Sequence, residues 1–357
     1  MSLFSPSFSC GAKIDEYIYA SAYKYNALIK VKVEDGKTEY VREFPNSDIV
    51  IENQHSRAFV HSNKVFFCPA MGNYIHIFDP STNNIEAIAI DRQNYKGEYY
   101  GQMYRESIIL TPKTVGGDIL WFSMSKMEIS VLVKWEKVRH YMPQNAQYAF
   151  LRVAQADDLL YLPIYNTSSM LILNLDSETI RIINVQIDKL LGAYGGKNGI
   201  YLLANNNCFV YKWNKLNNKI EKCLVEEGFE TDNFYTFAIE LYKKTYLFPA
   251  CSYTYIASVQ DGRIKPLVKL DDAEGKLLFL EPFCNDDKIW ALPFQGEELL
   301  CISEKKVTLK KLELIKIDNS TKKKIVKNKL DSRILFYEGD EITINEFIEE
   351  IRKIRKE

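Results

Sequence analysis

Aromatic rings, amides and arginines recur together at several places in this 357-residue sequence. They gather in or just after the segments 46–55, 92–100, 138–148, 227–235 and 271–276. An aromatic plane beside amide and guanidinium donors suits the recognition of sugar rings or peptide segments. The side chains that we predict to bind a ligand are His55, Arg57, Tyr100, Gln102, Arg105, Tyr148, Arg152 and Tyr235. Any one of these tyrosines could instead pack between strands, with only its hydroxyl group in water.

Sequence motifs for catalysis and metal binding are missing. There is no His-Glu-x-x-His, Cys-x-x-Cys, calcium loop, Gly-x-Ser-x-Gly or phosphate-binding loop. Carboxylate pairs such as Asp157-Asp158 and Asp286-Asp287 lie where a tight turn favours Asp. We therefore predict no catalytic residue, no metal and no cofactor. The alternative is an enzyme acting on a carbohydrate or peptide, with single residues from several repeats meeting at a central channel.

The elements that position these side chains come from a repeat of about 45 residues, a period typical of propellers and other repeat arrays. Each unit contains an apolar strand that ends in Pro, a short loop and a second strand. The landmark positions are Pro69, Pro112, Pro163, Pro249 and Pro293, with degenerate copies at Ala22 and Leu203. The repeat runs from near residue 13 to near residue 314.

Turn residues recur at matching positions of each repeat, just before the landmark strand and after the strand that follows it. In the second unit, Ser62-Asn63-Lys64 precedes the strand that ends at Pro69, and 79–83 follows the next one. Asp, Asn, Gly and Ser favour such turns because they tolerate positive φ or bond their own backbone. Each unit thus has four short apolar runs, and helical spacing is absent. We predict an all-β fold, a seven-bladed β-propeller of four-stranded blades followed by a short C-terminal α-helix, with six blades as the runner-up.

This blade pattern resembles that of kelch-like and WD-type β-propellers. Gly116-Gly117 matches the paired glycine of a kelch blade in one unit, and the Trp-Asp ending of a WD blade is missing. The resemblance is architectural and implies the fold. No functional residue is carried over from it.

The geometry of a four-stranded blade places the polar segments together. The loop between the second and third strands and the connection to the next blade open on one face of the disc, which we call the loop-rich face. Loops on a rigid scaffold commonly carry function. We therefore expect a non-catalytic scaffold that binds a protein or a carbohydrate ligand on this face.

The composition argues against several classes of protein. The formal net charge is −1, which argues against a nucleic-acid-binding protein. No apolar stretch approaches the length of a membrane span, and no signal peptide is evident. The seven cysteines have no paired spacing and are typical of reduced thiols in the cytoplasm. Frequent Lys, Ile and Asn residues favour a bacterial source.

The pattern changes after the repeats. We expect the propeller to occupy 1–315, and 316–357 to contain a basic linker over Lys316–Lys329, a strand over Arg333–Tyr337 and an amphipathic helix over 344–355. The apolar face of this helix could dock on the propeller, recruit a partner or mediate self-association. Leu3–Cys10 or Arg333–Tyr337 is expected to supply a strand that closes the ring.

Overall fold

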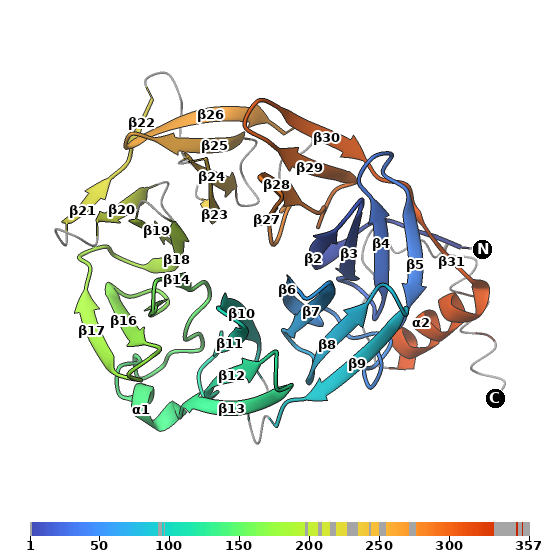
Figure 1. The fold of residues 1–357 in the computed structure, drawn as a ribbon, viewed down its shortest axis with the longest axis horizontal. Coiled ribbons are helices and arrows are strands. Elements are labelled where there is room, and N and C mark those ends of the chain that lie inside the picture. Colours follow the sequence, from blue (N-terminus) through green and yellow to red (C-terminus); the bar gives the residue numbers. More distant parts are fainter. Residues whose placement is uncertain are drawn as a thin grey trace.

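Seven antiparallel sheets surround a central axis, as Figure 1 shows in a view along that axis. The structure is a computed structural model that describes residues 2–91, 95, 97–196, 199–205, 209–214, 219–226, 235–242, 244–249, 255–270, 276–331, 348 and 352. Each sheet contains a meander of four consecutive strands, the first of which is innermost. The prediction of a seven-bladed β-propeller is confirmed.

The first four blades follow one another around the ring. Blade 1 contains β2 (Phe8–Ile14), β3 (Tyr17–Ala22), β4 (Leu28–Lys32) and β5 (Thr38–Arg42). Blade 2 contains β6 (His55–His61), β7 (Lys64–Pro69), β8 (Tyr74–Asp79) and β9 (Asn84–Ala89). Blade 3 contains β10 (Tyr99–Tyr104), β11 (Ser107–Pro112), β12 (Ile119–Ser123) and β13 (Glu128–Val133), and the short helix α1 (Trp135–Arg139) follows it. Blade 4 contains β14 (Ala154–Ala156), β15 (Leu159–Pro163), β16 (Ser169–Asn174) and β17 (Ile180–Asn184).

The other three blades complete the ring. Blade 5 contains β18 (Leu190–Gly196), β19 (Gly199–Ala204), β20 (Val210–Asn214) and β21 (Lys219–Lys222). Blade 6 contains β23 (Tyr235–Leu241), β24 (Lys244–Pro249), β25 (Tyr255–Gln260) and β26 (Arg263–Lys269), and β22 (Leu224–Val225) pairs with β26 in parallel as a fifth strand. Blade 7 contains β27 (Phe283–Asn285), β28 (Lys288–Ala291), β29 (Glu298–Ile302) and β30 (Val307–Lys311).

The landmark residues and turns lie where the repeat predicted them. The second strands of blades 2, 3, 4 and 6 end at Pro69, Pro112, Pro163 and Pro249. Several residues of the hairpin turns between first and second strands have positive φ, among them Asp15, Asn63, Asp157 and Asp286. Asp and Asn adopt this conformation more readily than most residues. The Asp pairs of the sequence thus serve as turn residues.

The hydrophobic core is divided among the interfaces between neighbouring blades. Phe66 and Ile77 of blade 2 pack with Leu110 and Phe122 of blade 3, and all four side chains are buried. Comparable clusters join the other neighbouring blades. Because both faces of a blade are covered in this way, middle strands such as β7 and β11 are apolar at nearly every position.

Two short strands, one before the first blade and one after the last, pair with each other outside the blades. β1 (Ser2–Phe4) pairs antiparallel with β31 (Ile315–Ile317), so that Phe4 faces Ile315 in the register. Blade 1 takes its strands from residues 8–42 and blade 7 from residues 283–311. Of the predicted closing segment Leu3–Cys10, the first part therefore joins this outer pair and the last part begins blade 1. Arg333–Tyr337 lies outside the described residues.

Blades 1 and 7, which meet where the ring closes, also contact each other directly. The Phe8 amide donates to the Pro293 carbonyl (3.0 Å), the Ser7 hydroxyl donates to the Phe294 carbonyl (2.8 Å), and Lys13 pairs with Asp286 (2.8 Å). The ring is thus closed by packing and hydrogen bonds between blades 1 and 7, and the β1–β31 pair holds the two ends together.

The expected basic linker over Lys316–Lys329 is wrong, because this segment is structured. β31 ends at Ile317, and helix α2 spans Asn319–Asp331. The Asp318 carboxylate caps α2 by accepting from the Ser320 and Thr321 amides, both at 2.9 Å. Within the helix, Ile325 and Val326 are buried, whereas the lysines at 323, 324 and 327 are exposed. The helix predicted over 344–355 falls almost entirely outside the described residues.

We predict that the outer strand pair contributes to global stability through one buried ring. Phe4 is buried against Tyr25, with ring centroids 5.3 Å apart, whereas its neighbour Leu3 is 42% exposed. Phe4→Ala should lower the free energy of unfolding by about 3 kcal/mol, because a buried cavity forms. Leu3→Ala, the matched control, should change it by less than about 0.5 kcal/mol. Denaturant unfolding measures both, and equal values would show that this strand pair does not secure the ring.

Candidate binding site at the centre of the loop-rich face

Four of the predicted residues meet at the axis of the ring. Arg57 on β6, Tyr100 on β10 and Arg152 just before β14 converge on Glu281, which precedes β27. Gln102 on β10 joins them through a hydrogen bond from Arg57. We call these five residues the axial cluster. First strands begin at the loop-rich face, and the connections between blades lie on it. The axial cluster therefore occupies that end of the ring.

Glu281 contacts three of the other four residues of the axial cluster. Its Oε1 lies 2.6 Å from Arg152 Nη1, and its Oε2 lies 3.8 Å from Arg57 Nε. The Tyr100 hydroxyl donates to the same Oε2 at 3.3 Å. These contacts join the connection before blade 7 to blades 2 and 3 and to the connection before blade 4. Side chains thus meet across the ring rather than between neighbouring blades only.

The cluster carries more positive than negative charge. Two guanidinium groups face one carboxylate, and their side chains are only 17% and 14% exposed. Burial lowers the pKa of each guanidinium, but Glu281 and the surrounding tyrosines raise it by more. Burial also raises the pKa of the Tyr100 hydroxyl to about 12. At neutral pH both guanidinium groups are therefore charged and the Tyr100 phenol is neutral.

Aromatic rings keep the guanidinium groups in place. The Arg57 and Arg152 guanidinium carbons lie 5.4 and 5.0 Å from the centre of the Tyr100 ring. Arg57 Nη1 also donates to the Gln102 side-chain oxygen at 3.0 Å. Stacking on an aromatic face and a fixed acceptor leave each guanidinium little freedom. The remaining N–H groups are thus presented in fixed directions.

The glycine-rich segment after residue 191 lets Arg152 approach the next blade. Arg152 forms an isolated parallel bridge with Gly192 of β18. A Cβ atom on Gly192 would lie 2.5 Å from the Cβ of Arg152. Any side chain at this position would push the arginine away from the axis. Gly192 thus permits a close contact between β18 and the segment that precedes β14.

Glu281 was missed by the sequence analysis. It lies in the apolar run Leu277–Phe283, where it is the only charged residue. A lone carboxylate in such a run is expected to be paired when buried. That pattern was the available signal, but its partners come from positions more than 120 residues away in the sequence. Only the folded ring brings them together.

Arg105 does not belong to this site. It lies in the turn between β10 and β11, at the opposite end of the blade from the loop-rich face. Its guanidinium pairs with Asp158 (2.6 Å) and Asp176 (3.4 Å) of blade 4, and its side chain is 63% exposed. We expected it on the loop-rich face, and its position shows that it joins two blades on the other face.

Tyr148 and Tyr235 have different environments. Tyr148 lies on the loop-rich face in the connection between blades 3 and 4, is 43% exposed, and meets Tyr165 edge to face at 5.3 Å. Tyr235 begins β23 and is buried in the core of blades 5 to 7. Tyr148 is therefore available to a ligand, whereas the Tyr235 ring is a packing residue. Most of segments 227–235 and 271–276 lies outside the described residues.

His55 is part of a buried hydrogen-bonded chain. Its Nδ1 lies 2.8 Å from the Ser21 hydroxyl, and its Nε2 lies 2.8 Å from His76 Nδ1. His76 Nε2 lies 2.9 Å from the Pro45 carbonyl, which can only accept. Each neutral imidazole therefore donates from Nε2 and accepts at Nδ1, and Ser21 donates to His55. A Ser–His pair resembles a catalytic arrangement, but Ser21, His55 and His76 are all buried, so this chain joins blades 1 and 2.

A cleft of 890 Å³ lies between blades 2 and 3, beside predicted binding segments. Its walls include Tyr95, Tyr99, Asp118, Val131 and Trp135. Val131 is 47% exposed although it points toward blade 2. The loop-rich face therefore offers aromatic and apolar surface outside the axis as well.

Comparisons with known proteins identify the fold. No family model matches the chain, and no curated protein matches it. Among solved structures, the extracellular domain of BT4673 from B. thetaiotaomicron matches with a TM-score of 0.58 and 9% identity, over 82% of this chain and 38% of that one. A chain of the mitotic checkpoint complex matches with a TM-score of 0.56 and 9% identity, over 88% and 91% of the two chains. The computationally designed Ika8 protein matches with a TM-score of 0.52 and 10% identity, over 87% and 98%.

These matches show a β-propeller. The architectural resemblance to kelch-like and WD-type propellers is thus confirmed at the level of the fold. The chain spans about two fifths of the BT4673 domain that it matches. No helix in the described part of the chain is long and apolar enough to cross a membrane. Among the same residues, no group of three His, Cys, Asp or Glu side chains is arranged to hold a metal ion.

We predict that the buried histidine chain makes the protein sensitive to acid. Burial lowers the pKa of His76 from 6.5 to about 4, and burial together with His76 lowers the pKa of His55 well below its usual value. Below pH 6.5 the unfolded chain binds protons that the folded chain does not. Stability is therefore complete above this pH and falls as the pH drops toward 4, by roughly 3 kcal/mol for His76.

Unfolding midpoints measured across this pH range test the prediction. The double variant His55→Gln/His76→Gln should lose most of the slope, although it is less stable at neutral pH. Replacement of the exposed His140 by Gln should leave the slope as in the native protein. A native protein with constant stability between pH 7 and 4.5 would contradict the assignment.

Proposed function

We propose that this protein is a binding scaffold whose axial cluster recognises a carboxylate group of a protein or glycan ligand. The single observation that carries the proposal is that two arginines share one carboxylate at the centre of the loop-rich face. Each guanidinium has five N–H donors, and one carboxylate with Gln102 uses only part of them. A second carboxylate would balance the remaining positive charge and use the donors left over.

The arrangement also explains how such a ligand would be selected. Guanidinium groups bind planar carboxylates in a bidentate manner, and partial burial strengthens the interaction relative to water. Exposed Tyr148 and the cleft beside Trp135 offer rings for the rest of a peptide or sugar chain. One solved propeller of the same fold belongs to a protein complex, which supports a binding role by analogy of fold alone. Seven cysteines without paired spacing support a cytoplasmic location for this role, and frequent Lys, Ile and Asn residues support a bacterial source.

Two variants with opposite expected effects test the proposal. Glu281→Gln removes the internal competitor and should raise the affinity for a carboxylate roughly tenfold, whereas Arg57→Gln should lower it roughly tenfold, since a hydrogen bond to a charged group is lost. Glucuronate and N-acetylglutamate amide serve as probes for the glycan and peptide sources. Calorimetric titration gives the affinities.

Controls separate binding from folding. Arg105→Gln removes an arginine on the opposite face and should leave both affinities unchanged. The double variant Arg57→Gln/Glu281→Gln keeps one cation, and its net charge of +1 equals that of the native cluster, so it should fold and bind more weakly than Glu281→Gln. If neither probe binds the native protein or Glu281→Gln, the axial cluster is a structural ion pair and the proposal is wrong.

An enzyme acting on a carbohydrate or peptide is the second candidate. Convergence of Arg57, Arg152 and Glu281 on the axis favours it, because perturbed charged groups gather at active sites. Both oxygens of Glu281 are already occupied by Arg152, Arg57 and Tyr100, so a proton-transfer role would first require these contacts to break. If the protein cleaves a uronate-containing glycan or an acidic peptide and Glu281→Gln abolishes cleavage, catalysis replaces simple binding.

A further inference from the structure

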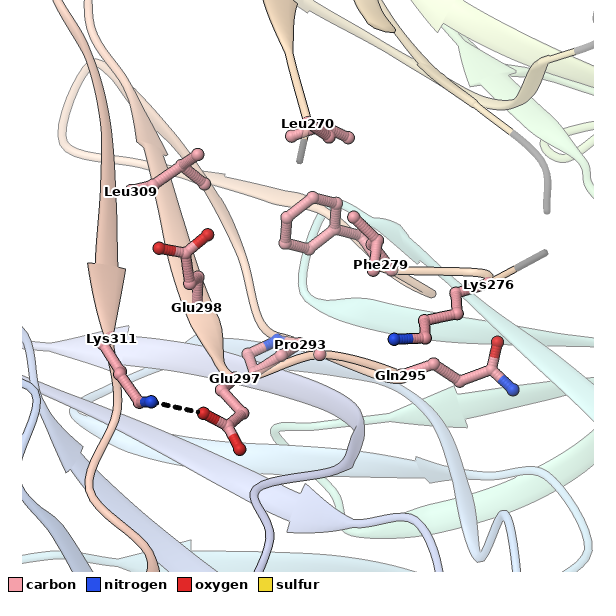
Figure 2. A pocket seen from close by; sticks show the side chains of 11 residues that line it. Leu270, Lys276, Phe279, Pro293, Gln295, Glu297, Glu298, Leu309 and Lys311 are labelled. Atoms are coloured by element: carbon pink, nitrogen blue, oxygen red, sulfur yellow. Dashed lines mark ion pairs between the residues drawn. The ribbon is translucent and has the colours of Figure 1, made fainter. Parts of the chain in front are cut away.

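A second pocket opens on the loop-rich face between blades 6 and 7. It has a volume of 410 Å³, which lies in the range of small-molecule sites, about 300 to 1,000 Å³. The connection Lys276–Phe279 forms one wall, and the loop after β28, from Pro293 to Glu298, forms another. Figure 2 shows the side chains that line it.

The floor of this pocket is apolar and held in place. Leu270 and Phe279 are buried, and Leu309 packs against them. The Phe279 ring meets Phe248 edge to face at 6.3 Å, which fixes its plane. Leu270, Phe279 and Leu309 lie on the same side of the pocket in Figure 2. A large aliphatic or aromatic side chain would find complementary surface there.

Hydrogen bonds make the walls of the pocket rigid. The Phe294 amide donates to the Leu278 carbonyl at 2.7 Å, and the Leu277 amide donates to the Gln295 side-chain oxygen at 2.6 Å. Phe279 and Pro293 form an isolated antiparallel bridge. The connection and the loop are thus tied at three points. A ligand would enter a shape that already exists, which reduces the entropy cost of binding.

Four charged side chains surround the rim of the pocket, namely Lys276, Glu297, Glu298 and Lys311. Glu297 pairs with Lys311 at 2.8 Å. Within the described part of the chain, the side chains of Glu298 and Lys276 make no hydrogen bond or close ion pair. Glu298 lies opposite Lys311 in the β29–β30 register, and its charge acts on that lysine. Figure 2 places Glu298 and Lys276 on opposite sides of Pro293. The pocket therefore presents an anion and a cation on either side of an apolar floor.

We infer that this pocket binds an amino-acid unit that has a large apolar side chain between a cationic and an anionic group. The side chain would occupy the floor formed by Leu270, Phe279 and Leu309. Glu298 would accept hydrogen bonds from the cation, and Lys276 would donate to the anion. A free apolar amino acid has this chemistry, and so has a peptide in which such a residue lies between a lysine and a glutamate.

This inference is independent of the axial cluster. Within the described residues, the charged pocket side chains Lys276 and Glu298 make no hydrogen bond or ion pair with the axial cluster. The pocket would therefore bind through a different pair of charges. A carboxylate probe for the axis lacks the apolar side chain, and a probe for this pocket requires it. If the binding test of one site fails, the proposal for the other site is therefore unaffected.

Four related probes distinguish the contributions of the pocket. Leucine has all three groups, N-acetylleucine lacks the ammonium, leucinamide lacks the carboxylate, and glycine lacks the side chain. The native protein should bind leucine and lose roughly tenfold in affinity for each of the first two analogues, because a charged hydrogen bond is lost. Glycine should not bind at millimolar concentration. Acetyl-Lys-Leu-Glu-amide tests the peptide source, and whichever of it and leucine binds more tightly identifies the natural form.

Variants on the rim assign the partners. Glu298→Gln should bind leucine and N-acetylleucine equally, and Lys276→Gln should bind leucine and leucinamide equally. Both changes are at exposed positions, so folding should be unaffected. Glu304→Gln, at the other end of blade 7, should preserve the native preferences. The inference is overturned if neither leucine nor the tripeptide binds, or if leucine and glycine bind alike, or if the two rim variants keep the native discrimination.

Discussion

Each blade of this ring is stable because its two neighbours cover its apolar faces. A four-stranded sheet with two apolar faces is stable only if another sheet covers each face. In a ring every blade is covered by its neighbours, so the ring must close. Here blades 1 and 7 meet through hydrogen bonds such as Phe8 to Pro293. The β1–β31 pair then holds the chain ends together outside the sheets. Closure brings side chains that are distant in the sequence to a common axis.

The axial cluster follows from that closure. Glu281 would be an isolated buried carboxylate if the ring were open, because its partners belong to blades 2 and 3 and to the connection before blade 4. Burial of one unpaired charge is costly, whereas a carboxylate between two guanidinium groups is compensated. The cluster thus ties the far sides of the ring together, and its surplus of positive charge makes the same residues suitable for an anionic ligand.

The loop-rich face and the opposite face use the same residue types for different purposes. Arg105 on the opposite face pairs with Asp158 and Asp176 of the adjacent blade and remains mostly exposed, where an ion pair contributes little. Arg57 and Arg152 at the axis are largely buried, where each charge strongly affects its neighbours. Burial, and not residue type, separates a surface contact between blades from a candidate binding site.

The blades could be predicted from local sequence patterns, because strand alternation, turn residues and a recurring Pro need no distant partner. Asp157 and Asp286 could be recognised as turn residues, and Pro69 and Pro112 as strand ends, before any contact was known. The burial and the partners of individual side chains, by contrast, depend on how the ring closes. His55 turned out to face Ser21 and His76 in the core, Arg105 lay on the other face, and Glu281 joined Arg57 and Arg152 from a segment that had offered no motif. The reason is that a side chain's pairing depends on which strands the ring brings to the axis, and one strand's sequence does not contain that information.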